Sequence, residues 1–123
     1  ENNLEKNITL TGYLFDGPEK YEIFRNSKIV VHPAVYDSGG MAAAEALVWG
    51  IPGISFDLEA LKTYYPKGMI KVEINNIDSF AQQIVMLVNS LEKYRDLAKE
   101  ARQFVLDEWD WEKRATEIIE KLS

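Results

Sequence analysis

The sequence predicts an α/β fold: a doubly wound parallel sheet covered by helices, with further helices towards the C-terminus. Two observations support this. Short segments of strand type alternate with segments of helical type between residues 8 and 74, which is the pattern of parallel sheets with crossover helices. Beyond residue 80 the apolar residues recur at the helical period instead. A length of 123 residues suits a single domain.

The chain is expected to start with a strand and a short helix. Residues 8–14 (ITLTGYL) are rich in β-branched and aromatic residues, and the turn residues Asp16-Gly17-Pro18 follow them, so they predict a strand. Residues 18–27 predict a helix, because proline suits the first helical turn.

A second strand and helix follow. Residues 28–31 begin the apolar run KIVVHP, which predicts a strand buried on both faces and ended by Pro33. After the loop 34–39, residues 41–49 predict a helix that closes at Gly50. This helix is apolar nearly all round, so we expect it to be buried.

Residues 54–56 and 69–74 predict two more strands, and the segment 58–65 between them is left open between a helical turn and a loop. Ligands of such sheets bind at the carboxyl ends of strands. These ends correspond here to the loops 14–18, 32–40 and 57–60.

The remaining chain is expected to be helical. Three apolar faces at the helical period predict three helices, the last with Asp110 as its N-cap. The faces are Phe80, Ile84, Leu87, Val88 and Leu91; then Leu97, Ala101, Phe104 and Val105; then Trp111, Ala115, Ile118, Ile119 and Leu122. Trp109 and Trp111 are interpreted as core residues or as part of a face for another domain.

Composition excludes several classes of protein. A net charge of -6 leaves no basic stripe for a nucleic-acid backbone, so no nucleic-acid partner is expected. The absence of cysteine excludes disulfides and thiolate sites and favours a cytoplasmic location. No apolar run is long enough to span a bilayer, and peripheral membrane contact is left open. A single histidine, His32, predicts no metal site, and we interpret it as a packed or capping residue near the cleft.

The segment 36–50 (YDSGGMAAAEALVWG) holds the main functional candidates. Ser38, Gly39 and Gly40 lie between a predicted strand and a predicted helix, where the first helical amides, such as that of Met41, form an anion site. A buried Glu45 would need a partner, either a structural hydrogen bond or a ligand such as the hydroxyls of a ribose. The pattern suggests a nucleotide, with Asp37 facing what lies beyond its phosphates.

The segment HPAVYDSGGMAAAEALVWGIPGISFD closely resembles the donor-binding motif of the retaining, glycogen-synthase-like GT-B glycosyltransferases, the glycosyl transferases group one family. That motif reads P-S-x-x-E-x-F-G-x-x-x-x-E-A-x-A-x-G-x-P-V-V-A. Asp37 and Glu45 keep its two acids at their spacing, and Glu45-Ala46, Gly50 and Pro52 match as well. Similarity also extends to ITLTGYL and to EWDWEKRA, so it covers nearly the whole chain.

The resemblance implies a Rossmann-like domain that binds a nucleotide-diphospho-sugar and transfers a hexose-type sugar with retention, without a metal or cofactor. It implies that Glu45 binds the ribose, that the amides of residues 39–41 bind the distal phosphate and the sugar, and that Asp37, the catalytic candidate, contacts the sugar near the reacting carbon. Ser38 belongs to the same loop. Gly12 and Tyr13 beside the base, and Glu59 and His32 beside the donor, are further candidates.

The sequence departs from the motif in three ways. Asp37 is shorter than the usual Glu, Ser38-Gly39-Gly40 replaces Gly-Phe-Gly, and Gly53 replaces Val. The resemblance further implies that residues 1–123 are a partial C-terminal domain, inactive alone, without the N-terminal domain that holds a saccharide or lipid-linked acceptor. With the family's strand order 3-2-1-4-5-6, we expect either a rearranged sheet edge or pairing with a second chain in a homodimer.

The leading interpretation is therefore a glycosyltransferase of polysaccharide or glycoconjugate biosynthesis. A non-catalytic binding or assembly module of the same fold is the alternative. A phosphoacceptor receiver domain would require an acidic cluster after its first strand and a later lysine at a strand end, and neither is seen.

Overall fold

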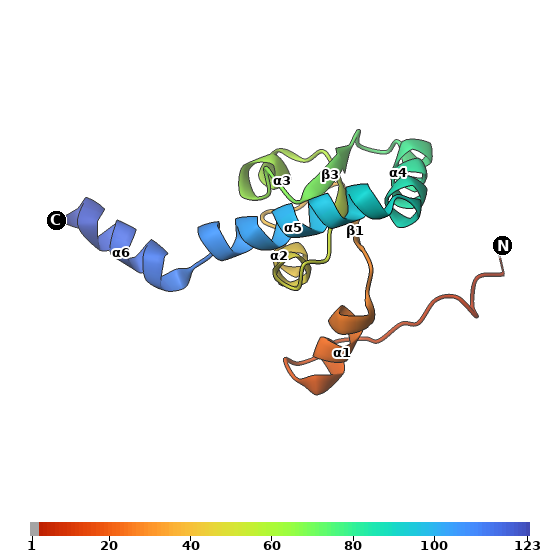
Figure 1. Cartoon of the computed structure of the whole chain (residues 1–123), viewed down its shortest axis with the longest axis horizontal. Coiled ribbons are helices and arrows are strands. Elements are labelled where there is room, and N and C mark those ends of the chain that lie inside the picture. Colours follow the sequence, from red (N-terminus) through yellow and green to blue (C-terminus); the bar gives the residue numbers. More distant parts are fainter. Residues whose placement is uncertain (1–2) are drawn as a thin grey trace.

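The computed structural model describes residues 3–123, which form a small parallel sheet with helices on both faces (Figure 1). The elements are α1 Pro18–Asn26, β1 Val30–His32, α2 Met41–Val48, β2 Gly53–Phe56, α3 Glu59–Tyr64, β3 Met69–Val72, α4 Ile77–Asn89, α5 Leu91–Glu108 and α6 Trp111–Leu122. The predicted α/β class and the succession of elements from residue 18 onwards are confirmed.

The three strands lie in the order β1-β2-β3, and both pairs are parallel. Val31 is opposite Ile54, and Ile54 is opposite Ile70. Helix α2 connects the first pair of strands and α3 connects the second. Because all strands run the same way, their carboxyl ends, and the loops that follow them, lie at one edge of the sheet.

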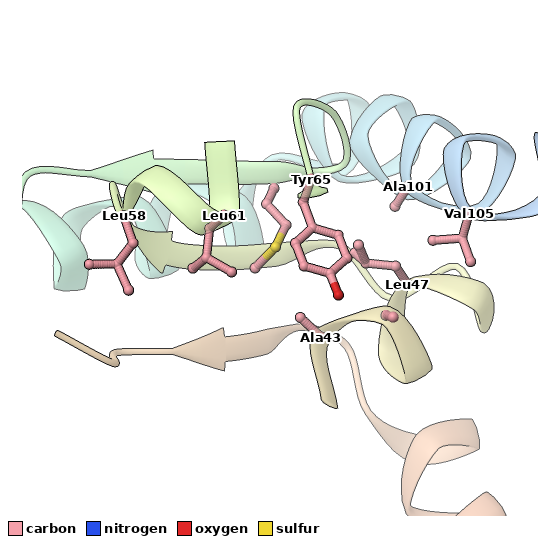
Figure 2. Packing of buried hydrophobic residues seen from close by; sticks show 9 residues of the cluster. Ala43, Leu47, Leu58, Leu61, Tyr65, Ala101 and Val105 are labelled. Atoms are coloured by element: carbon pink, nitrogen blue, oxygen red, sulfur yellow. The ribbon is translucent and has the colours of Figure 1, made fainter. Parts of the chain in front are cut away.

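Two apolar clusters cover the two faces of the sheet. The alternation of side chains along β2 sends Ile54 and Phe56 to one face, where they pack with Phe80 and Leu87 of α4. The opposite face is covered by α2, α3 and the second half of α5, as Figure 2 shows. The labelled residues there are Ala43, Leu47, Leu58, Leu61, Tyr65, Ala101 and Val105.

The predicted strand at residues 8–14 is wrong. Residues 8–15 form neither helix nor strand, and Leu10 and Tyr13 are 92% and 82% exposed. A β-strand is stable only when a neighbour accepts its hydrogen bonds, and none of the three described strands pairs with this segment. The composition of the segment favours a strand, but it has no strand to pair with here.

The expected burial of β1 on both faces is also wrong. The strand is only three residues long, and Val31 is 47% exposed. The cause is its place in the sheet: β1 pairs with β2 on one side and with no other described strand on the other. Pairing with a second chain across this edge stays a prediction.

Helix α2 is half-buried, whereas the sequence predicted burial all round. Ala43, Ala44, Ala46 and Leu47 are buried, and Met41, Glu45 and Val48 lie on the exposed side. The difference arises because the sheet and α5 pack against one side of α2, whereas Met41 and Val48 on its other side are 58% and 37% exposed.

The C-terminal helices were predicted with one error in a boundary. The apolar face predicted for residues 80–91 extends past the end of α4, which stops at Asn89. Ser90 is the N-cap of α5 and accepts a hydrogen bond of 3.5 Å from the amide of Lys93. Leu91 therefore belongs to α5. The segment left open at 58–65 is helical as α3.

Helix caps were predicted correctly. Asp110 accepts hydrogen bonds from the amides of Glu112 and Lys113 at 2.9 and 3.1 Å, and Pro18 occupies the first turn of α1. Helix α6 continues away from the sheet (Figure 1), and it contains no buried residue. Within residues 3–123 no helix combines the length and apolar character needed to cross a membrane.

Candidate functional site

The candidate site is the loop between β1 and α2, at the carboxyl edge of the sheet. Its last residue, Gly40, is the N-cap of α2 and has left-handed dihedral angles, φ 60° and ψ 44°. The left-handed backbone favours glycine, and a Cβ atom at this position would also lie 2.9 Å from Leu61 Cδ2 of α3.

Asp37 holds the loop together. Its Oδ1 accepts hydrogen bonds from the amides of Gly39 and Gly40, at 2.8 and 2.7 Å. Its Oδ2 lies 2.5 Å from Nε2 of His32, the last residue of β1. The two amide hydrogen bonds, with a smaller contribution from His32, lower the pKa of the Asp37 carboxyl below its usual value.

This arrangement changes which amides are available to an anion. We expected the amides of residues 39–41 to bind phosphate, but Asp37 already occupies those of Gly39 and Gly40. Within the described part of the chain, no acceptor reaches the amides of Met41 and Ala42 in the first turn of α2. These two groups, with the positive end of the helix dipole behind them, are the donors left for an anion.

The expected buried environment of Glu45 is wrong. The side chain of Glu45 is 45% exposed, and its Oε2 forms an ion pair with Nζ of Lys20 in α1 at 2.9 Å. Lys20 also pairs with Asp16 at 2.9 Å. The hydrogen bond to Glu45, followed by that to Asp16, raises the pKa of Lys20. The charge of Glu45 is thus balanced by a lysine at the surface, and no burial cost arises.

Behind the loop lies an aromatic support that the sequence analysis did not identify. The hydroxyl of Tyr65 donates a hydrogen bond of 2.9 Å to the carbonyl of Gly40, and the residue is fully buried. Burial raises its pKa to about 12. The ring stacks on Trp109, with centroids 5.6 Å apart and planes at 8°. The only sequence signal was an aromatic pair before Pro66, since Tyr65 and the loop are 25 residues apart.

The other candidates lie outside this cluster. Gly12 and Tyr13 belong to the exposed segment before α1, where the ring of Tyr13 contacts Phe15. Glu59 begins α3 and is exposed, with Lys62 at 3.7 Å. Ser38 is exposed on the outer side of the loop. The structure therefore brings together His32, Asp37, Gly39, Gly40 and Met41, with Glu45 one turn further along α2.

Three surface grooves of about 700, 380 and 330 Å³ lie on β3 and the helices from α3 onwards, and none is lined by the loop or by Glu45. In the described part of the chain, no three His, Asp or Glu side chains are placed to hold a metal ion together.

The fold and the loop define an α/β protein with a parallel sheet, and in such proteins ligands bind where a strand ends and a helix begins. Comparison of sequences is more specific: residues 1–104 match the family described as Glycosyl transferases group 1. The chain belongs to this family, as the spacing of Asp37 and Glu45 had indicated.

A curated protein and a solved structure, among other matches, are similar to the chain. A poly(ribitol-phosphate) alpha-N-acetylglucosaminyltransferase of Staphylococcus aureus (strain COL) is 28% identical over 128 residues, which cover 98% of this chain. The crystal structure of TarM matches 96% of the chain with a TM-score of 0.80 and 24% identity, and this shows that the GT-B fold is shared. The chain spans 24% of the length of each of them.

Proposed function

We propose that this chain binds the nucleotide-diphospho-sugar donor of a glycosyltransferase that transfers a hexose-type sugar with retention of its anomeric configuration. Residues 1–123 act as part of the C-terminal, donor-binding domain, and an N-terminal domain binds the acceptor. Membership of the Glycosyl transferases group 1 family supports glycosyl transfer. The particular donor, stereochemistry and domain arrangement are our proposal.

The observation that carries the proposal is the geometry of the loop at the start of α2. Two amides, of Met41 and Ala42, have no acceptor among the described residues, and they lie at the positive end of a helix at the carboxyl edge of the sheet. A diphosphate bound there is stabilised as its negative charge increases on departure from the sugar. The reaction proposed needs no metal or other cofactor.

The two acids have separate roles in this proposal. Asp37 fixes the loop through Oδ1, and its Oδ2 keeps lone pairs that can accept a hydrogen bond from a hydroxyl of the donor sugar next to His32. Glu45, one helical turn beyond Met41, accepts hydrogen bonds from the ribose hydroxyls. Because Lys20 already binds Glu45, the ribose must share this carboxylate with the lysine.

The acceptor and the sugar are proposed from the similar protein. Its name describes transfer of N-acetylglucosamine to poly(ribitol-phosphate). By this similarity we propose an N-acetylhexosamine donor and a polyol-phosphate or saccharide acceptor for the full-length protein, and a role in the biosynthesis of a polysaccharide or glycoconjugate.

The test is a titration of the full-length protein with UDP-, GDP- and ADP-sugars by calorimetry, together with an assay for release of the diphosphate. We expect one donor to bind and to turn over, with a product of retained configuration by NMR. Replacement Glu45→Gln is expected to weaken donor binding about tenfold, because a charged acceptor is lost from the ribose. The control Glu22→Gln, in the exposed ion pair with Arg25, should leave binding unchanged.

Three results would contradict the proposal. No binding of any donor would remove the function, and an inverted product would remove the retaining mechanism. Binding without turnover in the full-length protein would favour the non-catalytic module.

A further inference from the structure

Tyr65 is buried, is far from the loop in sequence, and bonds to the peptide group that carries one of the two amides of the anion site, that of Met41. The carbonyl of Gly40 accepts its hydroxyl at 2.9 Å, and also the amides of Ala43 and Ala44 at 2.8 and 3.4 Å. The carbonyl of Gly40 and the N–H of Met41 belong to the same planar trans peptide, so they point in opposite directions. A hydrogen bond that fixes the direction of the Gly40 carbonyl therefore also fixes the direction of the Met41 N–H, which is the opposite one.

The amides of Ala43 and Ala44 hold the carbonyl of Gly40 from within α2, and the hydroxyl of Tyr65 adds a hydrogen bond from outside this helix. Glycine has more conformational freedom than other residues, and rotation of the peptide between Gly40 and Met41 would turn the Met41 amide away from an anion. The hydrogen bonds to Asp37 fix the preceding amides of the loop but do not touch this peptide. Among the described side chains, only that of Tyr65 bonds to it directly.

Tyr65 is itself held on three sides. Its ring is parallel to that of Trp109, the C-cap residue of α5, and its backbone amide donates a hydrogen bond of 3.0 Å to the carbonyl of Leu61. Its carbonyl accepts a hydrogen bond from the ammonium group of Lys71 in β3. The hydroxyl thus has little freedom to move, and Tyr65 links the loop to the sheet and to the end of α5.

From this geometry we infer that Tyr65 is a positioning residue for the donor. Through the carbonyl of Gly40 it orients the Met41 amide towards the distal phosphate, with Trp109 fixing the ring. Tyr65 does not touch the substrate, and the inference rests on the proposed function.

The test compares Tyr65→Phe with Tyr64→Phe in the full-length protein. Both rings contact Trp109 and both changes remove one hydroxyl, but the hydroxyl of Tyr64 bonds to no described residue, and the residue is 46% exposed. UDP, GDP and ADP are first screened on the wild type by calorimetry. The nucleotide that binds is then titrated against each variant together with its nucleoside, which lacks phosphates.

We expect Tyr65→Phe to weaken binding of the diphosphate about five- to tenfold, the effect of one lost hydrogen bond, and to leave nucleoside binding unchanged. Tyr64→Phe should change neither. A general loss of structure would lower the affinities for the diphosphate and for the nucleoside together. The ratio of these two affinities therefore distinguishes a positioning role of Tyr65 from a role in stability. An unchanged ratio in a folded Tyr65→Phe protein overturns the inference and leaves the proposed function standing.

Failure of the wild type to bind any of the three nucleotides would overturn the proposed function, and this inference with it. If Tyr65→Phe does not fold, Trp109→Phe is measured in its place, because it keeps the hydroxyl but reduces the surface on which the ring stacks. We expect a smaller loss of diphosphate affinity in that variant, again without a loss of nucleoside affinity. An unchanged diphosphate affinity there also counts against the role of Tyr65.

Discussion

At the scale of single residues, Asp37 combines two functions that the sequence could not separate. Its Oδ1 binds two backbone amides and its Oδ2 meets His32, so the side chain is first of all a structural element of the loop. The shorter reach of Asp compared with the usual Glu of the motif suits this role, because an Asx-type contact to residues two and three positions further on needs a short side chain.

Asp37 should make the stability of the protein depend on pH in the acid range. Its pKa is lowered in the folded state by the Gly39 and Gly40 amides, so it stabilises the fold above its unfolded pKa of about 3.9, and this contribution disappears as the pH falls through the lower folded value. We expect Asp37→Asn to destabilise the protein by about 1–2 kcal/mol near neutral pH.

The measurement is the free energy of unfolding in urea, determined for the wild type and Asp37→Asn from pH 7 downwards. The difference between them should shrink below about pH 4. Asp16→Asn, at an exposed ion pair, is the control and should show no comparable effect. A difference that stays constant with pH would contradict the role of the ionised carboxylate.

At the scale of elements, the position of α5 is fixed by the residue before β3. Gly68 has φ 79°, and a Cβ atom there would lie 2.5 Å from Cα of Ala101 in α5. Its amide also donates to Glu100 at 3.0 Å, and its carbonyl accepts the amide of Gly53 at 3.1 Å. Helix α5 can cross the start of β3 at this distance only because the side chain is absent.

Replacement Gly68→Ala should therefore destabilise the protein by about 3 kcal/mol, from backbone strain together with overpacking against α5. The matched control is Gly12→Ala, which also has a positive φ, of 65°, but meets nothing within 4 Å. We expect that control to change the free energy of unfolding by less than about 1 kcal/mol, since the exposed segment can relax. Equal effects of the two changes in a urea titration would show that packing against α5 is not the cause.

At the scale of the whole molecule, stability is concentrated in the part of the chain from β1 to α5. The centre is β2, which is buried along its whole length and paired on both edges. Residues 8–15 and helix α6 contribute no buried residue, although both carry exposed apolar side chains such as Leu10, Phe15 and Leu122.

Hydrogen exchange should reveal this division. We expect the amides of residues 8–15 to exchange nearly as fast as in an unfolded chain, and those of Gly53–Phe56 at least about a thousandfold more slowly, since only the latter require global opening. Mass spectrometry of peptides after timed exchange measures the exchange rates, and light scattering measures the molecular mass of the protein. Protection of residues 8–15 in a monomer would contradict the described structure, and protection together with a doubled mass would indicate pairing between two chains.

Local patterns in the sequence determined most of the elements and the family. Helical periods, Pro18, Gly50 and Asp110 act within a few residues, and the spacing of Asp37 and Glu45 depends only on the chain between them.

The tertiary structure decided everything that requires a partner distant in sequence. The segment 8–14 has the composition of a strand without a strand to bond to, and β1 is exposed because it is an edge. Lys20 rather than burial determines the environment of Glu45, and Tyr65 reaches Gly40 only through the packing of α3 against the loop. Propensity is a property of a segment, but hydrogen bonds, ion pairs and burial belong to pairs of segments, and their positions are fixed only when the chain folds.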